Sequence, residues 1–226
     1  MKPFHILGEA RTPDGSQLTL LEHDGDTFLK LNGRQVMSSA ATASEVQLAE
    51  VACNFRPHIP NPRILVGGMG LGFTLRRVLA LVGPQAVVHV AECIPEVIAW
   101  NRELLGPANR EMMDDRRVSV KAIDVFKLIK TSMREADRYD AILLDVDNGP
   151  VAMVTSGNSR LYSRRGIATI VRALKPGGRV AFWSADEDRP FFARLQSEGL
   201  SVQSFDAKAH ERAKRAAHRI YLGEKR

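Results

Sequence analysis

Cysteine, aromatic residues and long hydrophobic runs are all scarce in this chain of 226 residues. Cys53 and Cys93 are its only cysteines, and their positions support neither a disulfide framework nor a thiolate metal site. The six histidines show no ligand spacing, so we expect no metal. No run approaches the roughly 18 apolar residues of a membrane-spanning helix, and the N-terminus, MKPFHILGEA, lacks the apolar segment of a secretory signal. These absences favour a cytoplasmic protein.

Positive charge is in modest excess, with 32 basic and 26 acidic residues. Most of the excess is spread along the chain, so it favours anionic partners only weakly. The exception is KAHERAKRAAHR, residues 208–219. Aromatic residues do not alternate with the basic ones there, which favours a solvated loop or helix face over a nucleic-acid-binding patch.

The first forty residues differ in pattern from the rest. In LTLLEHDGDTFLKLNG, Asp24-Gly25 lies between two strand-like runs, which is a strong hairpin signal. From Ser44 the apolar residues follow a helical period up to Pro57. We therefore expect a small N-terminal β-hairpin unit over residues 1–40 and a main domain over residues 41–226.

Short apolar strands alternate with amphipathic helices in the main domain. This alternation predicts an α/β fold, with a doubly wound, Rossmann-like parallel sheet covered by helices on both faces. No helix fits between the last two strands, which we expect to pair antiparallel. The predicted strands are ILVGG, AVVHVAE, RVSVKAI, YDAILLD, RVAFWSA, LSVQSFD and HRIYLG.

Glycines crowd the turn after the first of these strands, in ILVGGMGLG, residues 64–72. Ligands of doubly wound sheets bind at such turns, beyond the carboxyl ends of the strands. Gly68, Gly70 and Gly72 are spaced alternately, and Phe73 stands where a dinucleotide-binding GxGxxG pattern requires glycine. The pattern thus disfavours a pyrophosphate site, and a tight turn without a ligand stays an open alternative.

Acidic residues follow the next two strands. Glu92 ends AVVHVAE, where a carboxylate can accept hydrogen bonds from the hydroxyls of a ribose lying over the glycines. Asp124 follows the third strand, where it can accept a hydrogen bond from an adenine amino group. Its equally supported alternative is the N-cap of the helix VFKLIKTSM. Because these positions share one edge of the sheet, together they favour a nucleoside site.

The fourth strand ends in LDVDNGP, which contains Asp145 and Asp147. In a transfer from a sulfonium donor the thioether is already a good leaving group, so the enzyme mainly aligns the acceptor and removes its proton. Asp145 is suited to take or relay that proton, and Asp147 to bind a second cationic group. Alternatively, the loop only turns at Gly149-Pro150. Trp183, after a later strand, lines the pocket or belongs to the core, and its size favours the core.

With these motifs the chain resembles a class I S-adenosylmethionine-dependent transferase, and more closely the spermidine synthase-like polyamine aminopropyltransferases. The resemblance includes the small N-terminal β unit and extends over most of the chain. The segments that carry it are GGMGLGFTLRRVL, AECIPEVI, YDAILLDVDNGP and LYSRRGIATIVRALKPGG.

The resemblance implies a donor that is S-adenosylmethionine or its decarboxylated form, and a small amine acceptor. It also implies a role for each candidate position. In this assignment glycines 68, 70 and 72 give the donor room, Glu92 holds the ribose, Asp124 contacts adenine and Asp145 is the catalytic carboxylate. A homodimer formed through the N-terminal region stays open.

The chain departs from the family's pattern at its acceptor end. Where the family has an Asp in its glycine loop, this chain has Leu71. Where the family has a Tyr-His pair around its polyamine site, this chain has Leu48 and Ala49, and the position of a family Gln falls near Val36. Two alternatives therefore stay open. One is a methyltransferase on an unidentified acceptor, and the other is a non-catalytic nucleoside-binding module.

Overall fold

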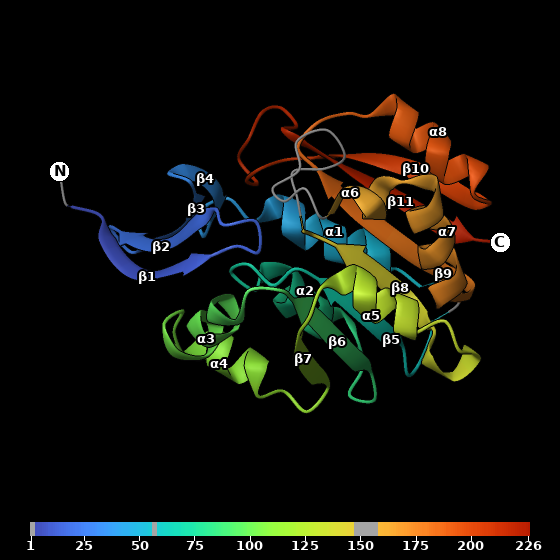
Figure 1. The fold of residues 1–226 in the computed structure, drawn as a ribbon, viewed down its shortest axis with the longest axis horizontal. Helices are drawn as coiled ribbons and strands as arrows, with labels where there is room; N and C mark the ends of the chain where they lie inside the picture. The colour runs from blue at the N-terminus through green and yellow to red at the C-terminus, as the bar shows by residue number, and fades with distance from the viewer. Residues whose placement is uncertain (1–2, 56–57, 147–157) are drawn as a thin grey trace.

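The computed structural model describes residues 3–55, 58–146 and 158–226. In it, a small antiparallel sheet at the N-terminus lies beside a larger sheet that has helices on both faces (Figure 1). The α/β fold class expected from the sequence is confirmed.

The N-terminal sheet has four strands in chain order: β1 (His5–Arg11), β2 (Gln17–His23), β3 (Asp26–Leu31) and β4 (Arg34–Ser38). Asp24 and Gly25 both have positive φ, 53° and 88°, as a two-residue hairpin turn with the right twist requires. Asn32 and Gly33 repeat this geometry between β3 and β4. The predicted hairpin is therefore part of a larger unit than expected.

The main sheet has seven strands in the order β10-β11-β9-β8-β5-β6-β7. Five strands pair in parallel, and β11 pairs antiparallel with β10, as predicted. The other neighbour of β11 is β9, and this pair is antiparallel as well. The chain order reverses at β5, between β6 and β8, which is where doubly wound sheets bind ligands. The strands are β5 (Arg63–Gly67), β6 (Val87–Glu92), β7 (Val118–Ala122), β8 (Tyr139–Leu144), β9 (Leu174–Ser184), β10 (Leu200–Ala207) and β11 (His218–Lys225).

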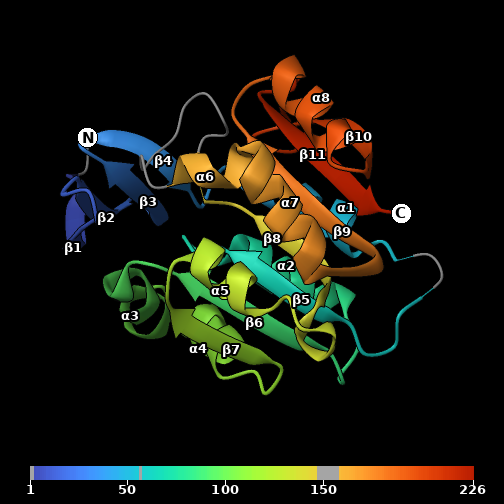
Figure 2. The same ribbon diagram turned by 45° about the vertical axis from the view of Figure 1, so that its right-hand side comes forward.

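Two hydrophobic cores cover the two faces of this sheet, because side chains alternate along each strand. Ile64 and Val66 face one core and Leu65 faces the other. The first core also receives the N-terminal sheet and the helices α1 (Ala43–Cys53), α2 (Phe73–Leu81), α3 (Pro95–Glu103) and α4 (Pro107–Met113). The second receives α5 (Val125–Thr131), α6 (Ser159–Tyr162), α7 (Arg164–Ala173) and α8 (Arg189–Ser197), and Figure 2 shows α5, α7 and α8 on the face turned toward the viewer.

The Lys-Pro-Gly-Gly segment makes a bulge in β9. Leu174 pairs with Tyr139 and Arg179 with Ala141, so residues 175–178 lie opposite Asp140 alone. The buried Asp140 carboxylate accepts hydrogen bonds from Lys175 Nζ and from the backbone N–H of Arg63, both at 2.7 Å. Asp140 therefore joins β5, β8 and the bulge.

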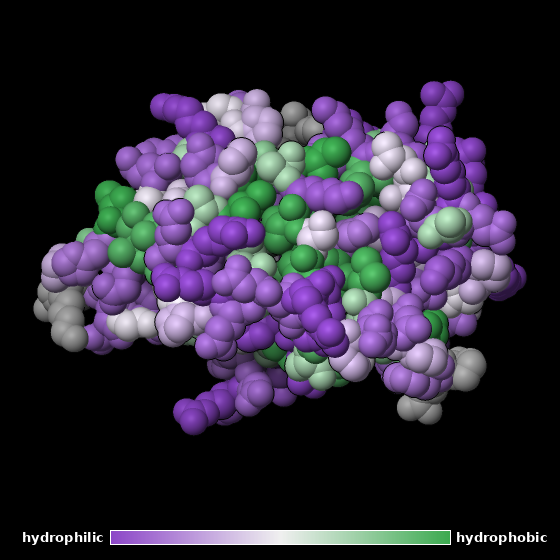
Figure 3. All heavy atoms as spheres, turned by 90° about the horizontal axis from the view of Figure 1, so that it is seen from below, coloured by the Kyte–Doolittle hydropathy of each residue, from purple (hydrophilic) through white to green (hydrophobic). Residues whose placement is uncertain are grey.

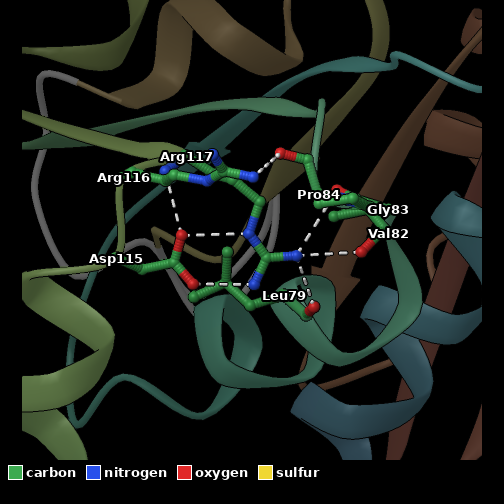
Figure 4. Close-up of polar contacts among 7 residues, drawn as sticks. All are labelled: Leu79, Val82, Gly83, Pro84, Asp115, Arg116 and Arg117. Atoms are coloured by element: carbon green, nitrogen blue, oxygen red, sulfur yellow. Dashed lines mark hydrogen bonds and ion pairs between the residues drawn. The ribbon is translucent and has the colours of Figure 1, made fainter.

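Arg117, just before β7, closes the C-terminal end of α2 (Figure 4). Its Nη1 donates to the carbonyl oxygens of Val82 at 2.8 Å, Leu79 at 3.0 Å and Gly83 at 3.5 Å, and its other nitrogens bind Asp115. The last carbonyl groups of a helix have no hydrogen-bond donor within the helix, and the Arg117 guanidinium is their donor here. It lies at the amino ends of the strands, the edge opposite the glycine loop.

The basic segment 208–219 forms the loop between β10 and β11 and the start of β11, and most of its basic side chains are exposed. Within the described ranges, no helix combines the length and the apolar character needed to cross a bilayer.

Candidate functional site

A cavity of about 160 Å³ lies at the carboxyl ends of the strands. Its walls come from the glycine loop, the ends of β6 and β8, the loop after β7, the start of α1 and the N-terminal sheet. Five of the seven candidate residues line it: Gly68, Gly70, Glu92, Asp124 and Asp145. Gly72 begins α2 outside the lining, and Asp147 lies outside the described residues.

Each glycine of the loop has a positive φ: 86° at Gly68, 48° at Gly70 and 87° at Gly72. A Cβ at Gly68 would collide with the backbone oxygen of Asp145, and one at Gly70 would lie 2.7 Å from Met37 Sδ. At Gly72 it would lie 2.8 Å from the terminal methyl of a methionine in α4. All three glycines therefore let other segments of this protein approach the loop, and Gly68 and Gly70 also line the pocket.

Glu92 is buried at the end of β6 and connects two backbone segments. Its Oε2 accepts the Met69 N–H of the glycine loop, and its Oε1 accepts the Ile94 N–H ahead of α3, both at 2.9 Å. Burial raises the pKa of this carboxyl, while these backbone bonds act against the rise. The carboxylate is thus fixed in the pocket wall, and each oxygen keeps lone pairs for a ligand.

Asp124 caps a helix and also lies in the pocket lining. Its Oδ1 caps α5 by accepting the Lys127 N–H at 2.9 Å, and the residue also lines the pocket. Its Oδ2 forms an ion pair with Arg160 Nη2 of α6 at 2.6 Å. The N-cap alternative and the pocket position are therefore compatible.

Asp145 follows β8, and its backbone N–H donates to Gly67 O at 2.9 Å, next to the glycine loop. Its Oδ2 accepts the hydroxyl of Thr74, in the first turn of α2, at 2.8 Å. Burial raises the pKa of this carboxyl above its ordinary value, because the charged form loses hydration. A carboxylate with a raised pKa is a stronger base than a solvated one.

A fourth carboxylate, Glu45, enters the pocket from the first turn of α1. It is buried, and its Oε2 accepts the Ser44 hydroxyl at 2.5 Å. Burial raises its pKa, and the charge of Asp145 raises it further. Glu45 was not among the predicted site residues. Its position in the first turn of a helix with many buried residues was the signal that could have identified it. Leu48 and Ala49 of the same helix are buried in the core instead.

The N-terminal sheet supplies an apolar wall. Met37 of β4 joins this wall to the glycine loop, because its sulfur accepts the Leu71 N–H at 3.2 Å. The Leu71 side chain is buried in the first core. The wall consists of Leu18, Leu29, Leu31, Val36 and Met37.

Trp183, at the end of β9, also lines the pocket. Its ring lies against His218, with ring centroids 4.6 Å apart. Its buried Nε1 has no hydrogen-bond partner in the part of the chain that is described.

Among the described residues, no cluster of three His, Cys, Asp or Glu side chains is arranged to hold a metal ion. The acids of the pocket instead bind backbone N–H groups, hydroxyls or an arginine. Such carboxylates can also accept hydrogen bonds from hydroxyl or amine groups of a ligand.

Solved structures of spermidine synthases share this fold. A spermidine synthase in complex with the transition-state analogue AdoDATO aligns over 98% of this chain and 74% of its own, with a TM-score of 0.77 and 16% identity. The spermidine synthase from Thermotoga maritima aligns over 98% of this chain and 73% of its own, with a TM-score of 0.74 and 16% identity. At these identities the likeness establishes the fold.

Two curated relatives are polyamine aminopropyltransferases. The protein from Pyrobaculum calidifontis is 30% identical over 122 residues, and that from Corynebacterium efficiens is 31% identical over 125 residues. Each match covers 54% of this chain, but only 41% and 22% of the respective relative. Residues 44–196 match the spermine/spermidine synthase domain. This match covers more than half of the chain. The chain therefore belongs to the spermine/spermidine synthase domain family.

Proposed function

We propose that this protein transfers an aminopropyl group from decarboxylated S-adenosylmethionine to an amine acceptor. The observation that carries the proposal is that Glu92, Asp124 and Asp145 line one pocket with the glycine loop. Membership of the family and the names of the curated relatives support the choice of reaction.

The nucleoside end of the donor fits the pocket region between β6 and α5. The free lone pairs of the Glu92 carboxylate can accept the two ribose hydroxyls, because its bonds to Met69 and Ile94 fix both oxygens. Asp124 can accept the adenine amino group beside its contacts with Lys127 and Arg160. The sulfonium then lies toward Asp145.

Asp145 is suited to prepare the acceptor for attack. Its carboxylate takes a proton from the bound ammonium and leaves a neutral amine with a free electron pair. This amine attacks the methylene carbon attached to the sulfonium sulfur, and a C–N bond forms as the C–S bond breaks. The electron pair of the C–S bond stays on sulfur, so methylthioadenosine leaves as a neutral thioether. The positive charge moves from sulfur to the product nitrogen.

Mass analysis tests this proposal directly. The protein is incubated with putrescine or another primary amine, and with either S-adenosylmethionine or its decarboxylated form. We expect an acceptor heavier by one aminopropyl unit, together with methylthioadenosine. A gain of one methyl group would instead identify a methyltransferase. Titration calorimetry against methylthioadenosine tests the pocket separately, and no detectable binding at millimolar ligand would refute the nucleoside site.

Two further parts of the proposal concern location and assembly. We place the protein in the cytoplasm, in keeping with Cys53 and Cys93, which are both free thiols. A homodimer joined through the N-terminal sheet would cover Phe4 and Ile6, whose surfaces are 50% and 62% exposed. Figure 3 shows a small group of hydrophobic residues near this end of the molecule and a larger group near the middle of the same face. Sedimentation equilibrium of the protein and of an Ile6→Lys variant tests the dimer.

A further inference from the structure

Two buried asparagines contact the glycine loop from the helices beside it. Asn101 of α3 is 0% exposed and Asn109 of α4 is 3% exposed. Asparagine is an unfavourable helix residue, because its amide competes with the backbone for hydrogen bonds. Two such residues buried on neighbouring helices indicate that their amides serve contacts between different segments.

Each asparagine holds one carbonyl group of the loop. Asn101 Nδ2 donates to the oxygen of Gly70 at 2.9 Å, and Asn109 Nδ2 donates to the oxygen of Leu71 at 3.0 Å. The same nitrogen of Asn109 donates to Asn101 Oδ1 at 2.7 Å, and that of Asn101 donates to Val97 O at 2.9 Å. Because each Nδ2 faces two oxygens, the orientation of both amides is determined.

Gly72 allows the asparagine pair to come close to the loop. A Cβ at this position would lie 3.0 Å from Asn101 Oδ1 and 3.1 Å from Asn109 Nδ2. Arg76, one turn into α2, donates to Asn109 Oδ1 through its Nη2. The third glycine of the loop therefore makes room for the side chains that hold the loop, whereas Gly70 lines the pocket.

The bond from Asn101 fixes the direction of the peptide group between Gly70 and Leu71. The C=O and the N–H of a trans peptide point in opposite directions. With the Gly70 oxygen on Asn101, the Leu71 N–H is directed toward Met37 Sδ in the pocket wall, at 3.2 Å. Rotation of this peptide group would break the bonds at both of its ends. Asn101 therefore sets the backbone surface that the loop presents to the pocket.

We propose that Asn101 and Asn109 are positioning residues for the donor, because they hold the glycine loop in the conformation against which the nucleoside binds. This inference rests on the proposed function. A loop that is fixed before the donor arrives loses less conformational entropy on binding. Asn101 acts through Gly70, which lines the pocket, whereas Asn109 acts through Leu71, which is buried in the first core. The loss of Asn101 should therefore weaken donor binding more than the loss of Asn109.

The experiment measures the affinity of the whole chain for methylthioadenosine by titration calorimetry. Asn101→Ala leaves the Gly70 carbonyl without its donor and should weaken binding about 5–10-fold, the effect of one hydrogen bond of ordinary strength. Asn109→Ala should weaken it by about 2–5-fold. In steady-state kinetics, Asn101→Ala should raise the KM for decarboxylated S-adenosylmethionine and leave kcat near that of the unaltered protein, because only donor binding is affected.

A matched control separates positioning of the loop from support of the fold. Asp140→Asn alters another buried polar residue, which lies near the amino ends of β5 and β8 and pairs with Lys175. This variant should lower the unfolding temperature without changing the dissociation constant of methylthioadenosine. All affinities are measured at a temperature at which thermal unfolding shows each variant to be folded, so they report the site alone.

An affinity of folded Asn101→Ala within about twofold of the unaltered protein would overturn the proposal. If Asn101→Ala does not fold, the affinity of Asn109→Ala decides in the same way. If the unaltered protein does not bind methylthioadenosine, the proposed function fails, and this inference fails with it. Binding by the unaltered protein and equally strong binding by both variants would refute the positioning role alone. The two failures are therefore distinguishable.

Discussion

Glu92 and Glu45 are both buried glutamates that line one pocket, but they are held in different ways. Glu92 is bonded to two backbone N–H groups, which cannot rotate or exchange protons with a ligand. Glu45 is bonded to one serine hydroxyl, which can rotate and serve as donor or acceptor. In the proposed function, backbone groups therefore hold the carboxylate at the nucleoside end in a fixed geometry, whereas a rotatable hydroxyl holds Glu45 near the acceptor end.

The largest expected effect is at the acceptor end. Asp145→Asn removes the group that takes the proton, so we expect the transfer rate to fall by roughly 10²–10⁴-fold. Methylthioadenosine affinity should change little, because the nucleoside end is untouched. Steady-state kinetics and calorimetry measure the two quantities, with Asp186→Asn as a control in the exposed segment after β9. Equal losses of rate and affinity would remove the distinction between the two ends.

The next effect is at the nucleoside end. In Glu92→Gln an amide nitrogen replaces one carboxylate oxygen and cannot accept the N–H of Met69 or Ile94. We expect methylthioadenosine to bind about 10–100-fold more weakly, and the free energy of unfolding to fall by about 1–3 kcal/mol. Glu96→Gln, at the exposed start of α3, is the control for calorimetry and thermal unfolding. Unchanged affinity would show that Glu92 serves only the fold.

The pH dependence of stability sharpens the comparison further. Burial raises the pKa of Asp145, so the folded protein binds a proton over an interval in which the unfolded chain does not. This carboxyl therefore lowers stability as pH rises through that interval. Asp145→Asn should be more stable than the unaltered protein at about pH 8, by an amount on the order of 3 kcal/mol, and the difference should vanish below about pH 3.

Comparing variant with parent is necessary because histidines oppose this trend. Burial lowers the pKa of His89 to about 4, so stability is lost through that residue as pH falls below the ordinary histidine range. Denaturant unfolding at a series of pH values gives the difference directly. A difference that does not depend on pH would contradict the raised pKa of Asp145.

The smallest expected effect concerns the ion pair between Arg160 and Asp124. Arg160→Met frees Asp124 Oδ2, which should then bind an adenine amino group more strongly. Because partly exposed ion pairs contribute little, we expect methylthioadenosine to bind only about 2–5-fold more tightly. Arg164→Met, on the exposed start of α7, is the control. Weaker binding in Arg160→Met would indicate that the arginine itself contacts the ligand.

Most of the fold could be predicted from the sequence, because alternating periodicity and turn residues are local signals. The seven strands of the main sheet and the Asp24-Gly25 hairpin were found in this way. Asn32-Gly33 carried the same hairpin signal and was overlooked. Helix α4 was also missed, because its seven residues are too few for a clear period. The division of the chain after residue 40 stays a prediction.

Site residues at the ends of strands could be predicted from the sequence. A site residue whose position depends on how a helix packs could not. Glu92, Asp124 and Asp145 follow parallel strands, so topology brings them to one edge of the sheet. Glu45 lies on a helix, and only the packing of α1 against the main sheet and α2 turns it toward that edge. The glycines show a second limit, because a pattern cannot distinguish room for a ligand from room for Met37. Asp147, outside the described residues, stays a prediction as the site of a second cationic group.

Met37 makes the two ends of the pocket dependent on each other. Its thioether is the partner of the Leu71 amide and is also part of the pocket wall. An acceptor that pushes this side chain aside deprives the amide of its partner and alters the turn that faces the donor. The same energy must appear in reverse when the donor binds first. Any factor by which one ligand changes the affinity for the other through Met37 must be the same in both directions.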